Sequence, residues 1–121
     1  MEKSFAHIHE RIDYSLITLK GVSFESEQIS QINNEVSRLI ERGKKNFIVD
    51  LSELKIMNST VSSMLLISLK KARAAGGDLI LANVPDLVAR QLDIVKLTSV
   101  FTIARTTEQA QLKLKSKPGA E

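Results

Sequence analysis

The spacing of apolar and polar positions in the first third of the chain predicts two strands followed by a helix. Residues 5–12 and 15–20 alternate between apolar and polar, as strands with one buried face do, and Asp13 and Tyr14 are expected to form the turn of an antiparallel hairpin. After the hairpin, apolar residues recur at the spacing of one helical face, at positions Ile29, Ile32, Val36, Leu39 and Ile40. We expect this helix to end at Gly43.

The rest of the chain alternates between strand-like and helical stretches. Runs rich in apolar, β-favouring residues predict three more strands, at residues 47–51, 78–82 and 100–104. Helical spacing predicts three more helices, at residues 59–75, from Pro85 in the first turn to about Lys96, and from residue 106 onward. Because strands alternate with helices after residue 26, we expect an α/β domain whose mixed sheet has about five strands, with about four helices covering it.

Length and composition agree with a single globular domain. The 121 residues are 43% hydrophobic and 26% charged, which suits one core and leaves no room for a second ordinary domain. We expect residues 1–115 to form the domain. Residues 116–121 include Pro118 and Gly119 and are predicted to be a flexible C-terminal tail.

Composition also disfavours several classes of protein. The apolar runs are too short to span a bilayer, and the N-terminus lacks the apolar core of a secretory signal. The absence of cysteine removes disulfides and thiolate chemistry. A net charge of +3, with four Phe and one Tyr, gives little support for nucleic-acid binding. We therefore expect a cytoplasmic protein that neither inserts directly into a membrane nor binds nucleic acid.

Two hydroxyl side chains, Ser59 and Thr60, stand at the predicted start of the second helix. They come directly before an apolar stripe at helical spacing, formed by Val61, Met64, Leu65 and Leu69. Ser and Thr are favoured N-cap residues, so we expect one of these two hydroxyls to cap the helix. A hydroxyl at this place lies close to free backbone N–H groups and to the positive end of the helix dipole, where a phosphate is tolerated.

Other residues that can carry chemistry are assigned structural roles. His7 and His9 lie two apart on a predicted strand and face the same way, but they lack a cysteine or carboxylate partner and are expected to be exposed strand histidines, not metal ligands. Asp50 has no local partner for acid–base work, and we expect it to accept hydrogen bonds from backbone N–H groups. Gly76 and Gly77 are expected to form a helix C-cap and turn. No cofactor and no metal is predicted.

Apolar side chains around the two hydroxyls offer a second kind of candidate. Met64 falls on the core face of the predicted helix and is expected to be a packing residue. Met57 precedes the hydroxyls in a loop, and two interpretations stay open: an exposed thioether that contacts a partner, or a buried apolar residue. Leu66 and Ile67 widen the apolar surface of the helix, and an exposed edge of it beside Ser59 would suit protein binding.

The segment 46–61 resembles the STAS domain of bacterial anti-sigma factor antagonists. In that family a strand ending in Asp-Leu-Ser leads through a loop to an Asp-Ser-Ser/Thr-Gly signature at a helix start. Residues 50–52 are Asp-Leu-Ser, and Ser59-Thr60 match the signature, whereas Asn58 stands in place of Asp and Val61 in place of Gly. The order of elements and the paired glycines extend the resemblance over about residues 5–110.

The resemblance implies a STAS-type fold and a partner switch. In such a switch the unphosphorylated antagonist binds an anti-sigma factor that is also a serine protein kinase, and a sigma factor is freed. Kinase transfer to Ser59, or as second choice to Thr60, ends the association, and a metal-dependent serine phosphatase restores it. The chain itself is then not an enzyme. The implied partner-binding residues are Met57, Asn58, Ser59, Thr60, Val61 and Ser62.

Two alternatives belong to other functional classes. One is a STAS subunit of a membrane lipid-transport complex, because those domains share the helix-start motif without depending on phosphorylation. The other is an enzyme or nucleotide sensor, which the sequence disfavours because it shows neither a nucleophile–base set nor a phosphate-binding loop. A neighbouring gene for a kinase and a phosphatase would support switching, whereas a permease and an ATPase would support transport.

Overall fold

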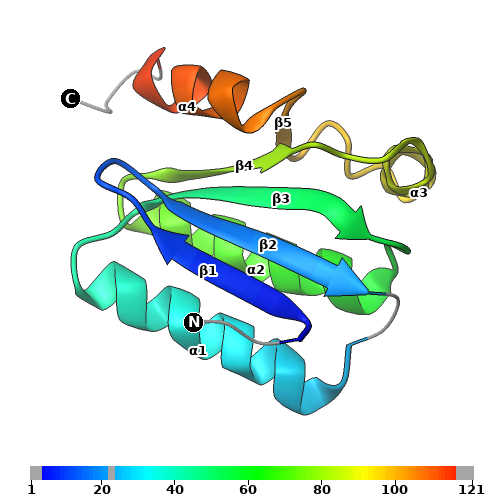
Figure 1. Ribbon diagram of the computed structural model, residues 1–121, viewed down its shortest axis with the longest axis horizontal. Helices are drawn as coiled ribbons and strands as arrows, with labels where there is room; N and C mark the ends of the chain where they lie inside the picture. The colour runs from blue at the N-terminus through cyan, green and yellow to red at the C-terminus, as the bar shows by residue number, and fades with distance from the viewer. Residues whose placement is uncertain (1–3, 22–23, 117–121) are drawn as a thin grey trace.

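A five-stranded mixed sheet lies at the centre of the molecule (Figure 1). The computed structural model describes residues 4–21 and 24–116. The predicted class, a single α/β unit with five strands and four helices, is confirmed. The elements are, in chain order, β1 (Ala6–Glu10), β2 (Ser15–Gly21), α1 (Ser26–Glu41), β3 (Asn46–Leu54), α2 (Ser59–Ala74), β4 (Asp78–Ala82), α3 (Asp86–Ile94), β5 (Thr102–Ala104) and α4 (Thr107–Ser116).

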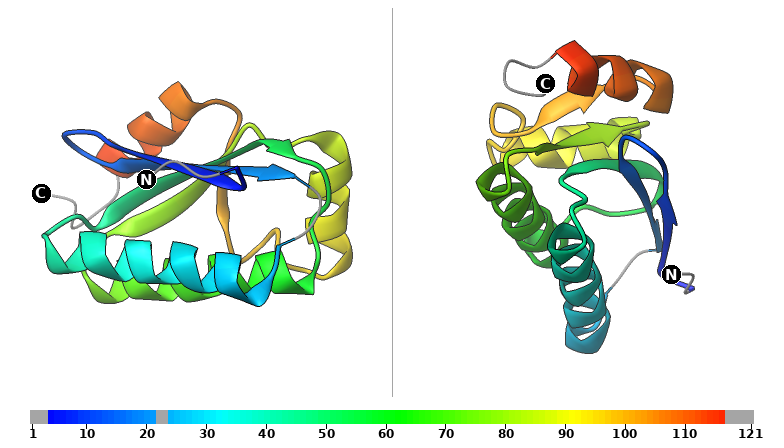
Figure 2. Two further views of the ribbon diagram at one scale, coloured as in Figure 1. Left: turned by 60° about the horizontal axis from the view of Figure 1, so that its bottom comes forward. Right: turned by 90° about the vertical axis from the view of Figure 1, so that its left-hand side faces the viewer.

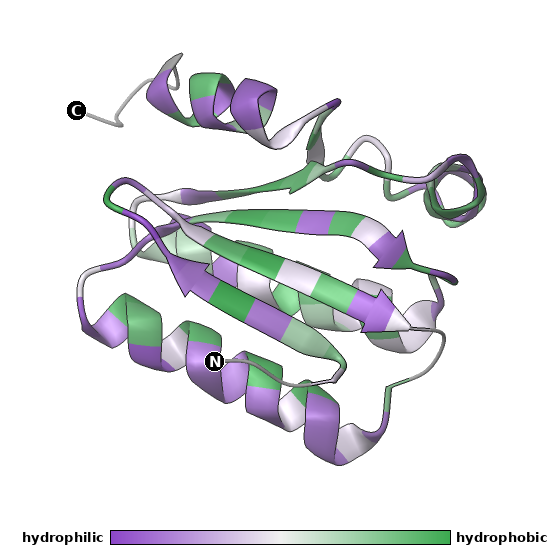
Figure 3. Cartoon of the chain, in the orientation of Figure 1, coloured by the Kyte–Doolittle hydropathy of each residue, from purple (hydrophilic) through white to green (hydrophobic). Residues whose placement is uncertain are grey.

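The sheet has the order β1-β2-β3-β4-β5, with β1 antiparallel to β2 and every other neighbouring pair parallel. Figure 2 shows α1 and α2 side by side on one face and α4 on the other. Phe47, Val49 and Leu51 of β3 face the core formed with α1 and α2, whereas Ile48 faces the smaller core under α4. This two-sided cover explains why the central strands are apolar at successive positions, as Figure 3 shows for β3 and β4.

Strand β3 extends three residues beyond the predicted end at residue 51. It stays paired with β2 past a register shift, with Lys20 opposite Glu53 and Gly21 opposite Leu54. The Lys55 N–H then donates to the Gly21 carbonyl oxygen at 2.9 Å. The apolar pattern does not predict this extension, because Ser52 and Glu53 are polar. Pairing with β2, and not apolar spacing, defines the end of the strand.

Helix α3 differs from its prediction at both ends. Pro85 is the N-cap, one residue before the helix, and α3 ends at Ile94 instead of about Lys96. The chain leaves the helix through Lys96, whose φ of 61° lies in the left-handed region, a position more commonly held by glycine. At the C-terminus Ser116 is the last residue of α4, and residues 117–121 of the predicted tail lie outside the described residues.

The glycine pair after α2 forms the predicted C-cap and turn. The Gly76 N–H donates to the Arg73 oxygen at 3.0 Å and the Gly77 N–H to the Ala72 oxygen at 2.9 Å, the pattern of a Schellman motif. Gly76 has φ +91°, whereas Gly77 is required for a different reason. A Cβ added to Gly77 would lie 1.9 Å from the carbonyl oxygen of Lys45, which directly precedes β3.

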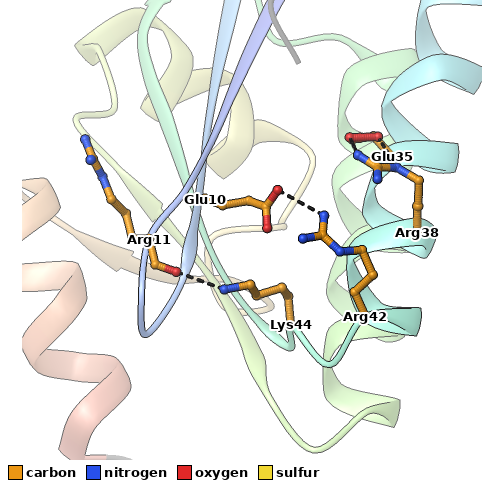
Figure 4. A network of polar contacts seen from close by, with 6 residues as sticks. All are labelled: Glu10, Arg11, Glu35, Arg38, Arg42 and Lys44. Carbon is orange, nitrogen blue, oxygen red and sulfur yellow. Dashed lines mark hydrogen bonds and ion pairs between the residues drawn. The ribbon is translucent and has the colours of Figure 1, made fainter.

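Charged side chains join the β1–β2 hairpin to the end of α1 (Figure 4). Arg42 donates to the Glu10 carboxylate at 3.1 Å, and the Lys44 ammonium donates to the Arg11 carbonyl oxygen at 3.1 Å. These contacts lie at the amino-terminal end of β3, away from the start of α2. They are exposed, so we assign them a modest contribution of at most about 1 kcal/mol each.

Helix α1 carries a further exposed ion pair in the same view (Figure 4). The Arg38 guanidinium donates twice to the Glu35 carboxylate, with an Nε–Oε1 distance of 2.9 Å. This hydrogen bond lowers the pKa of the Glu35 carboxyl, against the opposing effect of partial burial, and raises the pKa of Arg38. The pair is a local helix contact and lies outside the candidate site described below.

Candidate functional site

The predicted hydroxyls lie at the edge of the sheet where the parallel strands end. The loop of residues 55–58 leaves β3 there and enters α2, and α3 follows β4 at the same edge (Figure 1). Sites in open α/β sheets commonly form outside the carboxyl ends of the strands. The fold therefore places Ser59 and Thr60 at a position suited to a functional surface.

Asn58 caps helix α2. Its backbone is extended, with φ −133° and ψ 179°, and its side-chain oxygen accepts the Val61 N–H at 3.0 Å. The expectation that Ser59 or Thr60 is the N-cap is wrong, because Asn caps at least as well as either hydroxyl and comes first in the chain. Ser59 and Thr60 are thus the first and second residues of the helix.

The surroundings of the two hydroxyls suit a negative group. Ser59 and Thr60 are both exposed, and the first turn of α2 contains no acidic residue. The cap is a neutral amide, so the positive end of the helix dipole is not offset by a carboxylate within that turn. A phosphate on either hydroxyl would lie beside N–H groups that have no acceptor within the helix.

Only part of the predicted partner-binding segment is accessible. Asn58 is exposed together with the two hydroxyls, whereas the Met57, Val61 and Ser62 side chains are buried, at 4%, 1% and 8% exposure. Of the two interpretations of Met57, burial is the correct one, because the side chain packs into the core between the sheet and the helices. Met64 is buried, which confirms its predicted packing role.

An exposed stripe continues from Ser59 along α2. Ser63 and Ile67 follow at intervals of four residues, which places all three on one side of the helix. Ile67 is 43% exposed, while Leu66 is partly buried against the core. The predicted apolar edge of α2 is therefore formed by Ile67. Ile56, in the loop before the helix, is also exposed.

Sequence reasoning missed one residue of the site, Gln91 of α3. Its side-chain oxygen accepts the Met57 N–H at 2.7 Å, a partly buried contact between residues 34 apart. Nothing in the local sequence around Gln91 signals this role, because the contact depends on how α3 packs beside the loop. It fixes the backbone two positions before Ser59.

The other residues considered for chemistry, Asp50, His7 and His9, lie outside the start of α2. Asp50 accepts the Ser52 N–H at 2.9 Å, which confirms its predicted hydrogen bonding to the backbone. The His7 and His9 rings lie on β1 with centroids 4.1 Å apart, and His9 is exposed. Within residues 4–21 and 24–116, no group of three or more His, Cys, Asp or Glu side chains is placed to hold a metal ion. None of the described helices is both long and apolar enough to cross a membrane.

The capping role of Asn58 leads to a stability prediction. Asn58→Ala should lower the free energy of unfolding by about 1 kcal/mol, since the Val61 N–H loses its acceptor. Asn58→Asp keeps the acceptor and adds a charge that the helix dipole favours, so its stability should equal or exceed that of the wild type. Urea titration of the three proteins measures both effects. Equal stability of all three would mean that the cap contributes nothing.

Comparison with known proteins identifies the family. The STAS domain profile matches residues 7–110. The chain is 27% identical over 108 residues to BtrV of Bordetella bronchiseptica, a protein assigned as an anti-sigma factor antagonist, covering 88% of this chain and 92% of BtrV.

Solved structures of other proteins share the fold, among them the following two. A serine-to-glutamate variant of RsbS from Moorella thermoacetica aligns with a TM-score of 0.77 at 21% identity, covering 93% of this chain and 96% of that one. The Bacillus anti-sigma factor antagonist SpoIIAA aligns in its unphosphorylated form with a TM-score of 0.76 at 20% identity, covering 93% of this chain and 98% of that one. From the family match over most of its length and the shared fold, this chain belongs to the STAS domain family.

Proposed function

We propose that this protein is a cytoplasmic anti-sigma factor antagonist whose binding is controlled by phosphorylation of Ser59. Its partner is an anti-sigma factor that is also a serine protein kinase. The unphosphorylated chain binds this partner and frees a sigma factor, phosphorylation ends the association, and a metal-dependent serine phosphatase restores it. The chain acts by protein binding and contributes no catalysis of its own.

The exposed Ser59 hydroxyl at the first position of α2 carries this proposal. It lies beside a neutral cap and at the end of a helix dipole that favours negative charge. A phosphoserine brings about −1.5 to −2 charges at pH 7. The free domain accommodates that charge at the helix start, whereas an interface formed around a neutral hydroxyl has to desolvate it. Phosphorylation should therefore separate the partners without unfolding the antagonist.

The relatives support a switch of this kind. BtrV is assigned as an anti-sigma factor antagonist, and SpoIIAA has been solved both unphosphorylated and phosphorylated. This chain aligns with the two SpoIIAA forms at TM-scores of 0.76 and 0.69. A common fold in both states is what the proposed mechanism requires of an antagonist.

The two departures from the family signature are compatible with phosphorylation. Asn58 supplies a capping oxygen and, unlike the Asp of the family signature, places no negative charge beside the acceptor hydroxyl. With that charge absent, a dianionic phosphoserine meets less repulsion. The Val61 side chain is buried, so it does not stand beside Ser59 at the surface.

Phosphosite mapping tests the acceptor directly. After incubation with the cognate anti-sigma factor kinase and ATP, the wild type should carry its main phosphate on Ser59, and Ser59→Ala should lose that site. Ser30→Ala provides the control, because it removes an exposed serine of another helix, α1, that is not part of the candidate site. Its labelling should equal that of the wild type. Undiminished labelling of Ser59→Ala at Thr60 would reassign the acceptor to Thr60.

A further inference from the structure

The hydrogen bond between Gln91 and the loop before α2 joins two elements that the sequence separates widely. The Gln91 side-chain oxygen lies 2.7 Å from the Met57 nitrogen, and the contact is partly buried. Met57 comes two residues before Ser59. The acceptor on α3 therefore bonds to the backbone immediately upstream of the proposed phosphorylation site.

Helix α3 is a fixed support for this acceptor. Val88 and Leu92 are fully buried in the main core. The Ala89 N–H donates to the Pro85 oxygen at 2.8 Å at one end, and the Leu97 N–H to the Leu92 oxygen at 2.9 Å at the other. These two bonds keep the ends of α3 regular, whereas the burial of Val88 and Leu92 attaches the helix to the core. The Gln91 side chain therefore offers its acceptor to the loop from a helix that is packed in place.

Hydrogen bonds hold the loop between β3 and α2 at both of its ends. Its first residue, Lys55, donates to Gly21, and its last, Asn58, caps the helix. The bond from Met57 to Gln91 lies between them and accompanies burial of the Met57 side chain. Without it, the middle of the loop would be held by side-chain packing alone, which is less directional than a hydrogen bond.

We propose that Gln91 is a positioning residue that fixes the Ser59 hydroxyl for phosphoryl transfer. This inference rests on the proposed function. In the transfer, Ser59 Oγ forms a bond to the γ-phosphorus of ATP, the bond from that phosphorus to the β–γ bridging oxygen breaks, ADP leaves, and the hydroxyl proton passes to a base of the kinase. Gln91 acts on this step through the Met57 backbone and does not touch the reacting atoms.

The expected effect follows from the geometry of the reaction. An attacking oxygen has to lie within about 3–3.5 Å of its target, and a misplacement of about 1 Å can cost roughly a hundredfold in rate. Without the hydrogen bond to Gln91, the loop would be more mobile and the Ser59 hydroxyl would occupy several positions. Loss of the bond should therefore reduce kcat for Ser59 phosphorylation at least tenfold, with a smaller change in KM.

Three variants separate positioning from general destabilisation. Gln91→Leu keeps the size of the side chain and removes the acceptor, whereas Gln91→Glu retains an acceptor oxygen. Gln111→Leu is the matched control, since Gln111 also makes one partly buried side-chain hydrogen bond, to Tyr14 at 2.8 Å on the α4 side of the sheet. Thermal melting of each protein confirms that it is folded before any comparison.

Amide hydrogen exchange of the full chain, measured by NMR, provides a readout that needs no partner. The Met57 N–H should exchange at least tenfold faster in Gln91→Leu than in the wild type, and near the wild-type rate in Gln91→Glu and Gln111→Leu. Kinase assays with ATP should show the kcat loss for Gln91→Leu, substantial recovery for Gln91→Glu and no loss for Gln111→Leu.

The outcomes distinguish this inference from the proposed function. Unchanged Met57 exchange in Gln91→Leu would overturn the positioning role. Faster exchange with an unchanged kcat would overturn it too, because the loop would then be mobile without consequence for Ser59. Failure of the wild type to bind or be phosphorylated by the cognate kinase would refute the proposed function, while the exchange data would still decide whether Gln91 fixes the loop.

Discussion

Gly77→Ala should lower the free energy of unfolding by at least about 3 kcal/mol, a large part of the roughly 5–15 kcal/mol typical of a domain. The new Cβ would lie 1.9 Å from the Lys45 carbonyl oxygen and 2.8 Å from the Lys45 Cβ. Relief of this overlap requires movement of backbone, because carbonyl atoms cannot rotate away as a flexible side chain does.

The neighbouring strands make that movement costly. Lys45 leads into β3 and Gly77 into β4, whose first paired residues are Asn46 and Asp78. The Asp78 N–H donates to the Asn46 side-chain oxygen at 3.1 Å. Separating Gly77 from Lys45 therefore strains the beginning of the central strand pair and the cores on both of its faces.

Gly76→Ala is the matched control for this effect. Gly76 has φ +91° but open space around the position of a Cβ, so alanine there should cost only the left-handed backbone strain, about 1–2 kcal/mol. Urea unfolding of the two variants and the wild type gives the comparison. A Gly77→Ala protein as stable as Gly76→Ala would show that the close approach of Gly77 to Lys45 does not persist in solution.

Ser59→Asp should bind the anti-sigma factor at least about thirtyfold more weakly than the wild type. An unpaired charge at a buried interface costs roughly 2–5 kcal/mol, and the lower value corresponds to that factor. In the free domain the same charge faces the positive end of α2 and is neutral or stabilising by at most about 1 kcal/mol. The melting temperature of Ser59→Asp should therefore stay within a few degrees of that of the wild type. Ser59→Ala should bind the anti-sigma factor and stay bound in the presence of ATP, because it has no acceptor hydroxyl at position 59.

Isothermal titration calorimetry and thermal melting test both halves of this prediction. Asn34→Asp is the control, because it adds one negative charge to an exposed position of α1 with almost no change of shape. It should bind like the wild type. If Ser59→Asp bound as tightly as Asn34→Asp, the interface would lie elsewhere on the domain or binding would not depend on charge at Ser59.

Local sequence patterns predict the type and order of the elements, because their apolar spacing reflects burial. The run from Phe47 to Leu51 predicts a central strand, and the two glycines after α2 predict the end of that helix. The extension of β3 to Leu54 was missed, since it arises from pairing with β2 across a register shift. The end of α3 was misplaced because the left-handed residue is Lys96, where the sequence offers no glycine.

At the site, the sequence located the segment but not the role of each side chain. Ser, Thr and Asn are all good N-caps, so local preference could not decide among Asn58, Ser59 and Thr60. Burial of Met57 depends on packing between the sheet and the helices, which no local pattern encodes. The role of Gln91 could not be predicted for the same reason, because the Met57 N–H to which it bonds lies 34 residues away in the sequence.

The assignment of the cap to Asn58 has a consequence for genetic experiments. Because Ser59 itself holds no structural hydrogen bond through its side chain in the capping arrangement, replacing it leaves the helix start intact. Alleles at codon 59 should then accumulate to wild-type protein levels in the cell, and their phenotypes should report signalling. Alleles at codon 58 that remove the capping oxygen should mix signalling with reduced abundance, because a loss of about 1–2 kcal/mol can change steady-state levels several-fold.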